Sequence, residues 1–188
     1  MEQITSINAL NEKKSRNTDF TYIFETYYKR IYNYIYYRIN CNEEAEDLTS
    51  EIFEKAMIKI NTYSEDKSPF EVWLFAIARN VINDYFRRLK KHKAFSMDKL
   101  KRIISTEKNP EDVFVKSETN DELLKALNIL NRKERNIVAF KFGASLKNKE
   151  IAEIIGITES NVGVILYRTM KKLKKELERE DRYEQKKY

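Results

Sequence analysis

The chain has 188 residues, of which 41% are hydrophobic and 35% are charged, a size that suits one medium domain or two small ones. Three glycines and two prolines are too few for the many turns of an all-β protein, so long helices are expected. A formal net charge of +6 weakly favours nucleic acid or an acidic partner.

The side chains needed for catalysis or metal binding are scarce in this sequence. The single cysteine, Cys41, excludes an internal disulfide framework, and the single histidine, His92, lies far from it in the chain. The sequence contains no glycine-rich phosphate loop and no apolar run long enough to cross a membrane, and its first residues lack a signal core. We therefore expect a cytoplasmic protein without enzymatic activity, with no catalytic residue, metal or cofactor.

Apolar residues recur with helical spacing in three segments of the N-terminal half. These segments predict helices at Phe20–Ile39, Glu43–Ile60 and Phe70–Leu89, with a loop at Asn61–Pro69 and a polar tail at residues 1–18. The first segment is rich in tyrosine, which allows either base stacking or core packing. Because the rings follow the helical period, core packing is favoured.

The chain changes character after the third predicted helix. Residues 87–102 are strongly basic and residues 105–121 are rich in acidic side chains, and no apolar period runs through them. Helical spacing returns near Asn120. The sequence therefore predicts an all-α protein of two small helical domains, at 19–90 and 120–180, joined by a flexible charged linker at 91–119 and followed by a tail at 181–188.

The segment Lys149–Arg168 has the pattern of a helix-turn-helix. Such a motif needs a small residue where its helices cross and a turn residue that tolerates positive φ, and Ala152 and Gly156 fit these two positions. Thr158, just after the turn, is expected to cap the second helix through its hydroxyl oxygen. The apolar positions that lock the two helices together are Ile151, Ile155, Ile157, Val162 and Ile165 or Leu166.

The second helix of such a motif enters the major groove and presents its early residues to base edges. The exposed candidates are Glu159, Ser160, Asn161, Gly163, Val164, Tyr167 and Arg168. A basic stripe that includes Lys171 and Lys172 continues from Arg168 and suits phosphate contacts. The alternative for this stripe is a solvated helix end with favourable cations near its C-terminus.

Two parts of the chain together resemble a known family. Ala45–Ile60 (AEDLTSEIFEKAMIKI) and Phe70–Arg88 (FEVWLFAIARNVINDYFRR) resemble region 2 of the sigma-70 family, and Asn128–Leu177 resembles region 4. Their order and the short linker are similar to the minimal extracytoplasmic-function (ECF) type. The resemblance implies an alternative sigma factor that directs RNA polymerase to promoters. Its partners would be the β′ coiled coil and β flap of core polymerase, −35 duplex DNA, the −10 non-template single strand and, as a candidate, an anti-sigma factor. Membrane insertion is not expected.

The resemblance also assigns roles to residues of this sequence. It implies a surface for core polymerase on the second helix, at Asp47, Glu51, Glu54 and Lys55. It implies −10 recognition and melting by the loop at 61–69 and the third helix, through Ser64, Trp73, Arg79, Asn80, Asn83, Asp84, Arg87 and Arg88. Helical spacing places Asn80, Asp84 and Arg87 on one face. For Trp73, burial in the core is the alternative. The helix-turn-helix would bind −35 DNA.

The sequence departs from the family pattern at four positions. Ser50 replaces a usual glutamine, and Lys147 replaces a usual capping serine. Gly163 and Ile165 replace usual Lys and Arg residues in the recognition helix. Without these two cations, the −35 contact is expected to depend less on charge.

Three other classes of protein were weighed against the sigma factor. A stand-alone helix-turn-helix regulator accounts for the C-terminal half but leaves the two N-terminal segments unexplained. A helical interaction module of the anti-sigma type and an enzyme fit the sequence less well.

Overall fold

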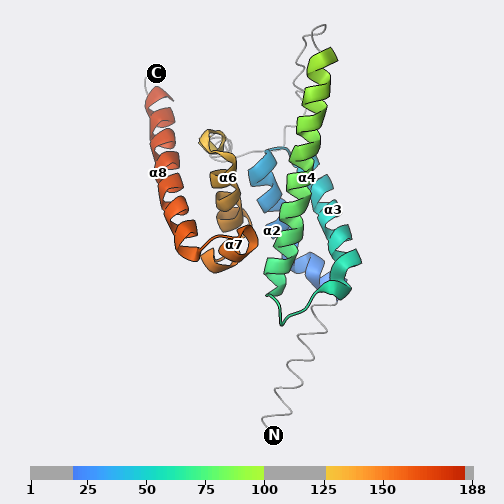
Figure 1. The fold of residues 1–188 in the computed structure, drawn as a ribbon. Helices are drawn as coiled ribbons and strands as arrows, with labels where there is room; N and C mark the ends of the chain where they lie inside the picture. Colours follow the sequence, from blue (N-terminus) through green and yellow to red (C-terminus); the bar gives the residue numbers. More distant parts are fainter. Residues whose placement is uncertain (1–18, 100–125, 185–188) are drawn as a thin grey trace.

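The protein is helical throughout the residues that the structure describes (Figure 1). The computed structural model describes residues 19–99 and 126–184, and these ranges contain α-helices, short 3₁₀ turns and a π-helical turn but no strand. The predicted all-α fold with two small domains is thereby confirmed. The predicted tail at 1–18 and most of the predicted linker lie outside the described residues.

The N-terminal domain consists of α2 (Phe20–Ile39), α3 (Asn42–Lys59) and α4 (Phe70–Lys99). The carboxylate of Asp19 caps α2 by accepting a hydrogen bond from the Thr21 amide at 3.0 Å. The helix ends at Asn40, whose φ of 58° places it in the left-handed region common at helix ends. The loop to α4 opens with a 3₁₀ turn, η1 (Ile60–Thr62).

The tyrosines of α2 divide between the core and the surface. Tyr27, Tyr34 and Tyr36 are buried, which confirms the core interpretation for them, whereas Tyr22 and Tyr28 are exposed. Apolar residues of α3 and α4 complete the core, among them Ile52, Phe53, Leu74, Phe75 and Ile82.

The third helix is longer than predicted. We expected it to end at Leu89, but α4 continues through the basic run to Lys99. The added residues contain neither glycine nor proline, and lysine, alanine and methionine are good helix formers, so high charge alone does not end the helix.

The C-terminal domain begins with a 3₁₀ turn, η2 (Leu127–Ile129), and continues through α6 (Arg132–Val138), a π-helical turn η3 (Ala139–Gly143), α7 (Asn148–Ile155) and α8 (Glu159–Glu184). Asn131 and Glu134 form a reciprocal capping box that starts α6. Helix α8 extends to Glu184, so the predicted tail at 181–188 begins inside a helix.

The geometry of α7 and α8 confirms the predicted helix-turn-helix. Gly156 ends α7 with a φ of 73°, and Ala152 is buried where the helices cross. The Thr158 hydroxyl accepts a hydrogen bond from the Asn161 amide at 3.2 Å, as expected of a helix cap. Lys147 provides no side-chain cap for α7; instead its own amide donates to the Glu150 carboxylate at 2.7 Å.

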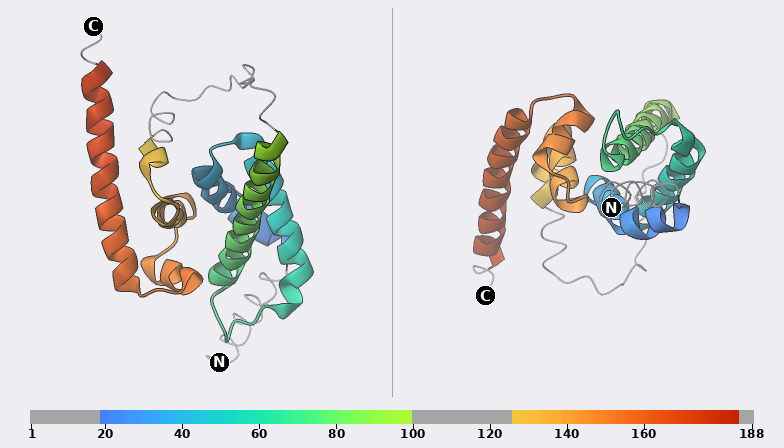
Figure 2. Two further views of the ribbon diagram at one scale, coloured as in Figure 1. Left: turned by 45° about the horizontal axis from the view of Figure 1, so that its top comes forward. Right: turned by 90° about the horizontal axis from the view of Figure 1, so that it is seen from below.

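The two domains pack side by side, with α6 and α7 lying between α8 and the N-terminal domain (Figures 1 and 2). The rings of Tyr34 on α2 and Phe140 on η3 stack with their centroids 4.4 Å apart, and both are fully buried. Gly143 lies against the α2 backbone, where an added β carbon would be 2.9 Å from the Asn33 carbonyl oxygen. The sequence did not predict this interface between domains.

Candidate polymerase and nucleic-acid interface

The residues predicted for −10 recognition lie on two different faces of α4. Asn80 and Arg87 are exposed and Asp84 is partly exposed, so these three share an accessible face as predicted. Arg87 forms an ion pair with Asp84, and Arg88 reaches the Glu51 carboxylate of α3 at 3.5 Å.

The second face of α4 is turned toward the C-terminal domain. The Arg79 guanidinium donates to the Ile154 carbonyl oxygen of α7 at 2.8 Å. The Asn83 side-chain oxygen accepts a hydrogen bond from Arg132 of α6 at 3.1 Å. In this arrangement Arg79 and Asn83 are engaged by the second domain, which sequence spacing alone did not indicate.

An aromatic cluster lies where the loop at 61–69 meets α4. Trp73 is half-buried, with its ring 5.4 Å from both Tyr63 and Phe70. The cluster holds the loop against the start of the helix, and Trp73 remains partly exposed. Ser64 is partly exposed, and its carbonyl accepts the Lys67 amide at 3.1 Å within the loop.

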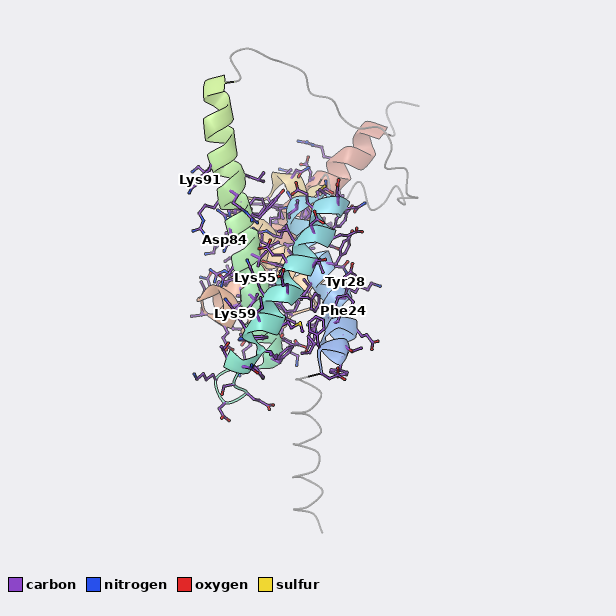
Figure 3. All side chains as sticks on the ribbon, turned by 90° about the vertical axis from the view of Figure 1, so that its right-hand side faces the viewer. Phe24, Tyr28, Lys55, Lys59, Asp84 and Lys91 are labelled. Carbon is purple, nitrogen blue, oxygen red and sulfur yellow. The ribbon has the colours of Figure 1, made fainter. Side chains whose placement is uncertain are left out.

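The predicted polymerase-binding residues line the outer side of α3, which Figure 3 shows beside α4, with Lys55 labelled. Asp47 and Glu54 are exposed. Glu51 accepts a hydrogen bond from Lys55 at 2.6 Å in addition to its contact with Arg88. The acidic character of this surface therefore resides mainly in Asp47 and Glu54, since Glu51 is already paired.

The candidates for −35 recognition lie along α8, and all but Gly163 are exposed. Tyr167 is 72% exposed, unusual for a large aromatic side chain in a packed domain. Lys172 forms an ion pair with Glu134 of α6, and the hydrogen bond from Lys172 is the main reason the pKa of Glu134 is lowered. A phosphate would have to compete for Lys172, whereas no carboxylate of the described residues pairs with Arg168 or Lys171.

Sequence reasoning missed the arginines that join the domains. Arg30 on α2 pairs with Glu71 at 2.8 Å and donates from Nε to the Ala144 carbonyl at 2.8 Å. Burial by itself lowers the pKa of Arg30, because it disfavours the charged guanidinium. The hydrogen bond and the negative charge of Glu71 outweigh this effect, so the pKa of Arg30 is raised. Arg135 on α6 donates to the Tyr37 carbonyl of α2 at 2.7 Å. Only their placement opposite the other domain distinguishes these residues from ordinary surface arginines.

Arg38 and Tyr34 show how strongly the interface excludes water. Arg38 is 5% exposed, and its guanidinium donates to the side-chain oxygen of Asn136, which also accepts the Tyr34 hydroxyl at 3.0 Å. Burial lowers the pKa of Arg38 and raises that of Tyr34 to about 12. Tyr34 is therefore neutral at physiological pH and able to donate this hydrogen bond.

Comparison with known families accounts for both domains. Residues 23–92 match the model of Sigma-70 region 2, and residues 120–173 match the model of Sigma-70, region 4. The matched segments include α3 and α4 in the first domain and the helix-turn-helix in the second.

Individual relatives agree with the family models. The chain is 30% identical over 161 residues to the ECF RNA polymerase sigma factor SigM of Bacillus subtilis, covering 81% of this chain and 91% of SigM. It is 32% identical over 154 residues to the ECF RNA polymerase sigma factor BldN of Streptomyces coelicolor, with 82% of this chain but only 58% of BldN covered. The chain therefore belongs to the sigma-70 family, in its ECF group.

The fold is similar to those of two proteins of known structure. The sigma factor RpoE of Bartonella quintana, solved in complex with the anti-sigma factor NepR, matches with a TM-score of 0.64 at 22% identity over 85% of this chain and 97% of that one. CnrH, solved with the cytosolic domain of CnrY, matches with a TM-score of 0.57 at 16% identity over 88% of this chain and 94% of that one. None of the described helices combines the length and apolar character needed to cross a membrane.

Proposed function

We propose that this protein is an alternative sigma factor that binds core RNA polymerase and directs it to promoters, acting in the cytoplasm without enzymatic activity of its own. The observation that supports this best is the presence, in one chain, of both the region 2 and the region 4 domains, each with its predicted nucleic-acid surface exposed at least in part. A stand-alone regulator would have no need of the first domain.

The proposed contacts follow the exposed surfaces. The outer side of α3, with Asp47 and Glu54, binds the β′ coiled coil, and the C-terminal domain contacts the β flap. The accessible face of α4, with Asn80, Asp84 and Arg87, and the loop at 61–69 bind the −10 non-template strand. The exposed residues of α8 bind the −35 duplex.

The packing between the domains has a consequence for this function. Arg79 and Asn83 are held by Ile154 and Arg132, so they are not free for DNA. We infer that α7 and α6 must leave α4 before the whole −10 surface is available. An anti-sigma factor, of the kind that NepR is for RpoE of Bartonella quintana, would act by keeping the domains together.

Transcription with purified components tests the proposed function. Core RNA polymerase with this protein should give specific run-off transcripts on genomic promoter fragments, whereas core alone should not. A stand-alone regulator would instead bind specific duplex DNA tightly without core and give no transcripts, which would contradict the proposal.

Charge reversal on α3 tests the polymerase surface. Asp47→Arg combined with Glu54→Arg should weaken binding to core by about tenfold or more, because two favourable pairings become repulsive. A matched double variant, Glu25→Arg with Glu153→Arg, changes net charge equally at exposed positions on α2 and α7, outside this surface, and should bind normally. Competition for core against the wild-type protein gives the measurement, and equal competition by the first variant would place the interface elsewhere.

Recognition of the −35 element should separate into two kinds of contact. Lys171→Ala removes a phosphate contact, so it should weaken binding to all promoters about equally. It should also lower the slope of the logarithm of the binding constant against the logarithm of salt concentration by roughly one unit. Asn161→Ala should instead change which −35 sequences are preferred, by on the order of 1–3 kcal/mol at one base pair. Selection from a promoter library measures both effects, and an unchanged preference with Asn161→Ala would show that α8 recognises DNA shape.

A further inference from the structure

A cavity of about 310 Å³ lies between the two domains, and three of the described residues that line it are arginines. Arg38 and Phe86 come from the N-terminal domain, and Leu130, Arg132 and Arg135 from the C-terminal domain. A cavity of this size is much larger than the ~30 Å³ that one water molecule occupies in the liquid. The space between these arginines is therefore large enough for a small polyatomic ion.

The three arginines lack compensating carboxylates among the described residues. The partners of Arg38 and Arg132 are the side-chain oxygens of Asn136 and Asn83, and those of Arg135 are the Tyr37 carbonyl and the Asn128 side chain. All of these acceptors are neutral. Arg38 is buried and Arg135 is partly buried, and buried positive charge without an opposite charge is costly, so the cavity favours a negatively charged occupant.

Two further observations point to such an occupant. The Nη2 nitrogen of Arg135 is buried and has no hydrogen-bond partner, so it is available as a donor. The guanidinium carbons of Arg38 and Arg132 lie 5.3 and 5.5 Å from the centre of the Phe86 ring, which holds both groups beside the cavity. Burial and the neighbouring Arg132 and Arg135 lower the pKa of Arg38, the direction that unneutralised positive charge produces.

We propose that this cavity binds a phosphate group of a small molecule. A phosphate carries close to two negative charges at neutral pH and presents several acceptor oxygens, which suits a site with three arginines better than a single carboxylate does. Because the donors come from both domains, the bound phosphate holds the domains together. This inference does not depend on the transcriptional role, since it concerns the isolated chain.

Binding of pyrophosphate and inorganic phosphate to the full-length protein tests the proposal, with sodium chloride at equal ionic strength as the reference. Calorimetry should show one site per chain, and the melting temperature should rise with phosphate but not with chloride. Arg132→Gln should weaken binding about tenfold, because it removes a charged hydrogen bond from an exposed residue that the core does not need. Arg179→Gln, an equal charge change near the far end of α8, should leave binding unchanged.

Three results would overturn the proposal. Equal weakening by Arg132→Gln and Arg179→Gln would show diffuse attraction to a basic protein instead of a site. Loss of single-stranded oligonucleotide binding in Arg132→Gln, with no phosphate binding in the wild type, would assign the arginines to nucleic acid. The third result is phosphate binding that appears only when acidic residues of the chain itself are changed to amides. It would show that carboxylates of the chain, and not a small molecule, neutralise the cavity. The residues to change are Glu107, Glu111, Asp112, Glu118 and Asp121.

Discussion

Gly143→Ala should separate the two domains. The new β carbon would lie 2.9 Å from the Asn33 carbonyl oxygen and 3.0 Å from the Tyr34 α carbon, and backbone atoms in a helix cannot move aside as a flexible side chain can. Overpacking of this kind destabilises the folded state by roughly 1–3 kcal/mol. We expect the interface to open because the clash falls where α2 meets η3, beside the stacked rings of Tyr34 and Phe140.

Gly163→Ala provides the matched control, since its β carbon would meet only the Asn148 side chain at 3.9 Å. Fluorescent labels at residues 58 and 167, both more than 70% exposed, would report the separation of the domains in a Cys41→Ser background. Energy transfer should fall in Gly143→Ala and stay constant in Gly163→Ala. Unchanged transfer with Gly143→Ala would contradict the expected separation and show that the interface adapts to the added methyl group.

Asn80→Ala combined with a Gly/Ser loop at 61–69 should abolish most promoter opening. Asn80 is exposed on α4, and the loop meets Trp73 through Tyr63, so both changes fall on the proposed single-strand surface. Loss of base contacts worth on the order of 1–3 kcal/mol predicts a decrease of about tenfold or more. Permanganate footprinting on a cognate promoter measures the opening.

Two further variants distinguish this effect from misfolding. Asn80→Ala alone changes an exposed side chain and should retain the melting temperature while losing part of the opening. Glu25→Ala, at an exposed position on α2 outside the proposed surface, should open promoters normally. Normal opening by the combined variant would exclude the loop and Asn80 from −10 recognition.

Most local features were predictable because they depend on neighbouring residues. The helical period of apolar residues located α2 and α3 almost to their ends, and Ala152, Gly156 and Thr158 defined the helix-turn-helix through their conformational preferences. The predicted end of α4 at Leu89 is wrong because a run of charge does not by itself end a helix, and lysine, alanine and methionine in this run are good helix formers.

Sequence by itself thus determined the helical class, the two domains and the exposed faces of α4 and α8, since each follows from spacing within one segment. The tertiary structure decided the contact between the domains. The burial of Tyr34 was foreseeable, but not its stacking on Phe140, and nothing local distinguished Arg79 or Arg132 from other surface cations. A periodic pattern shows which side of a helix avoids water; it does not show which distant surface covers that side, because the partner is chosen by shape and charge in three dimensions.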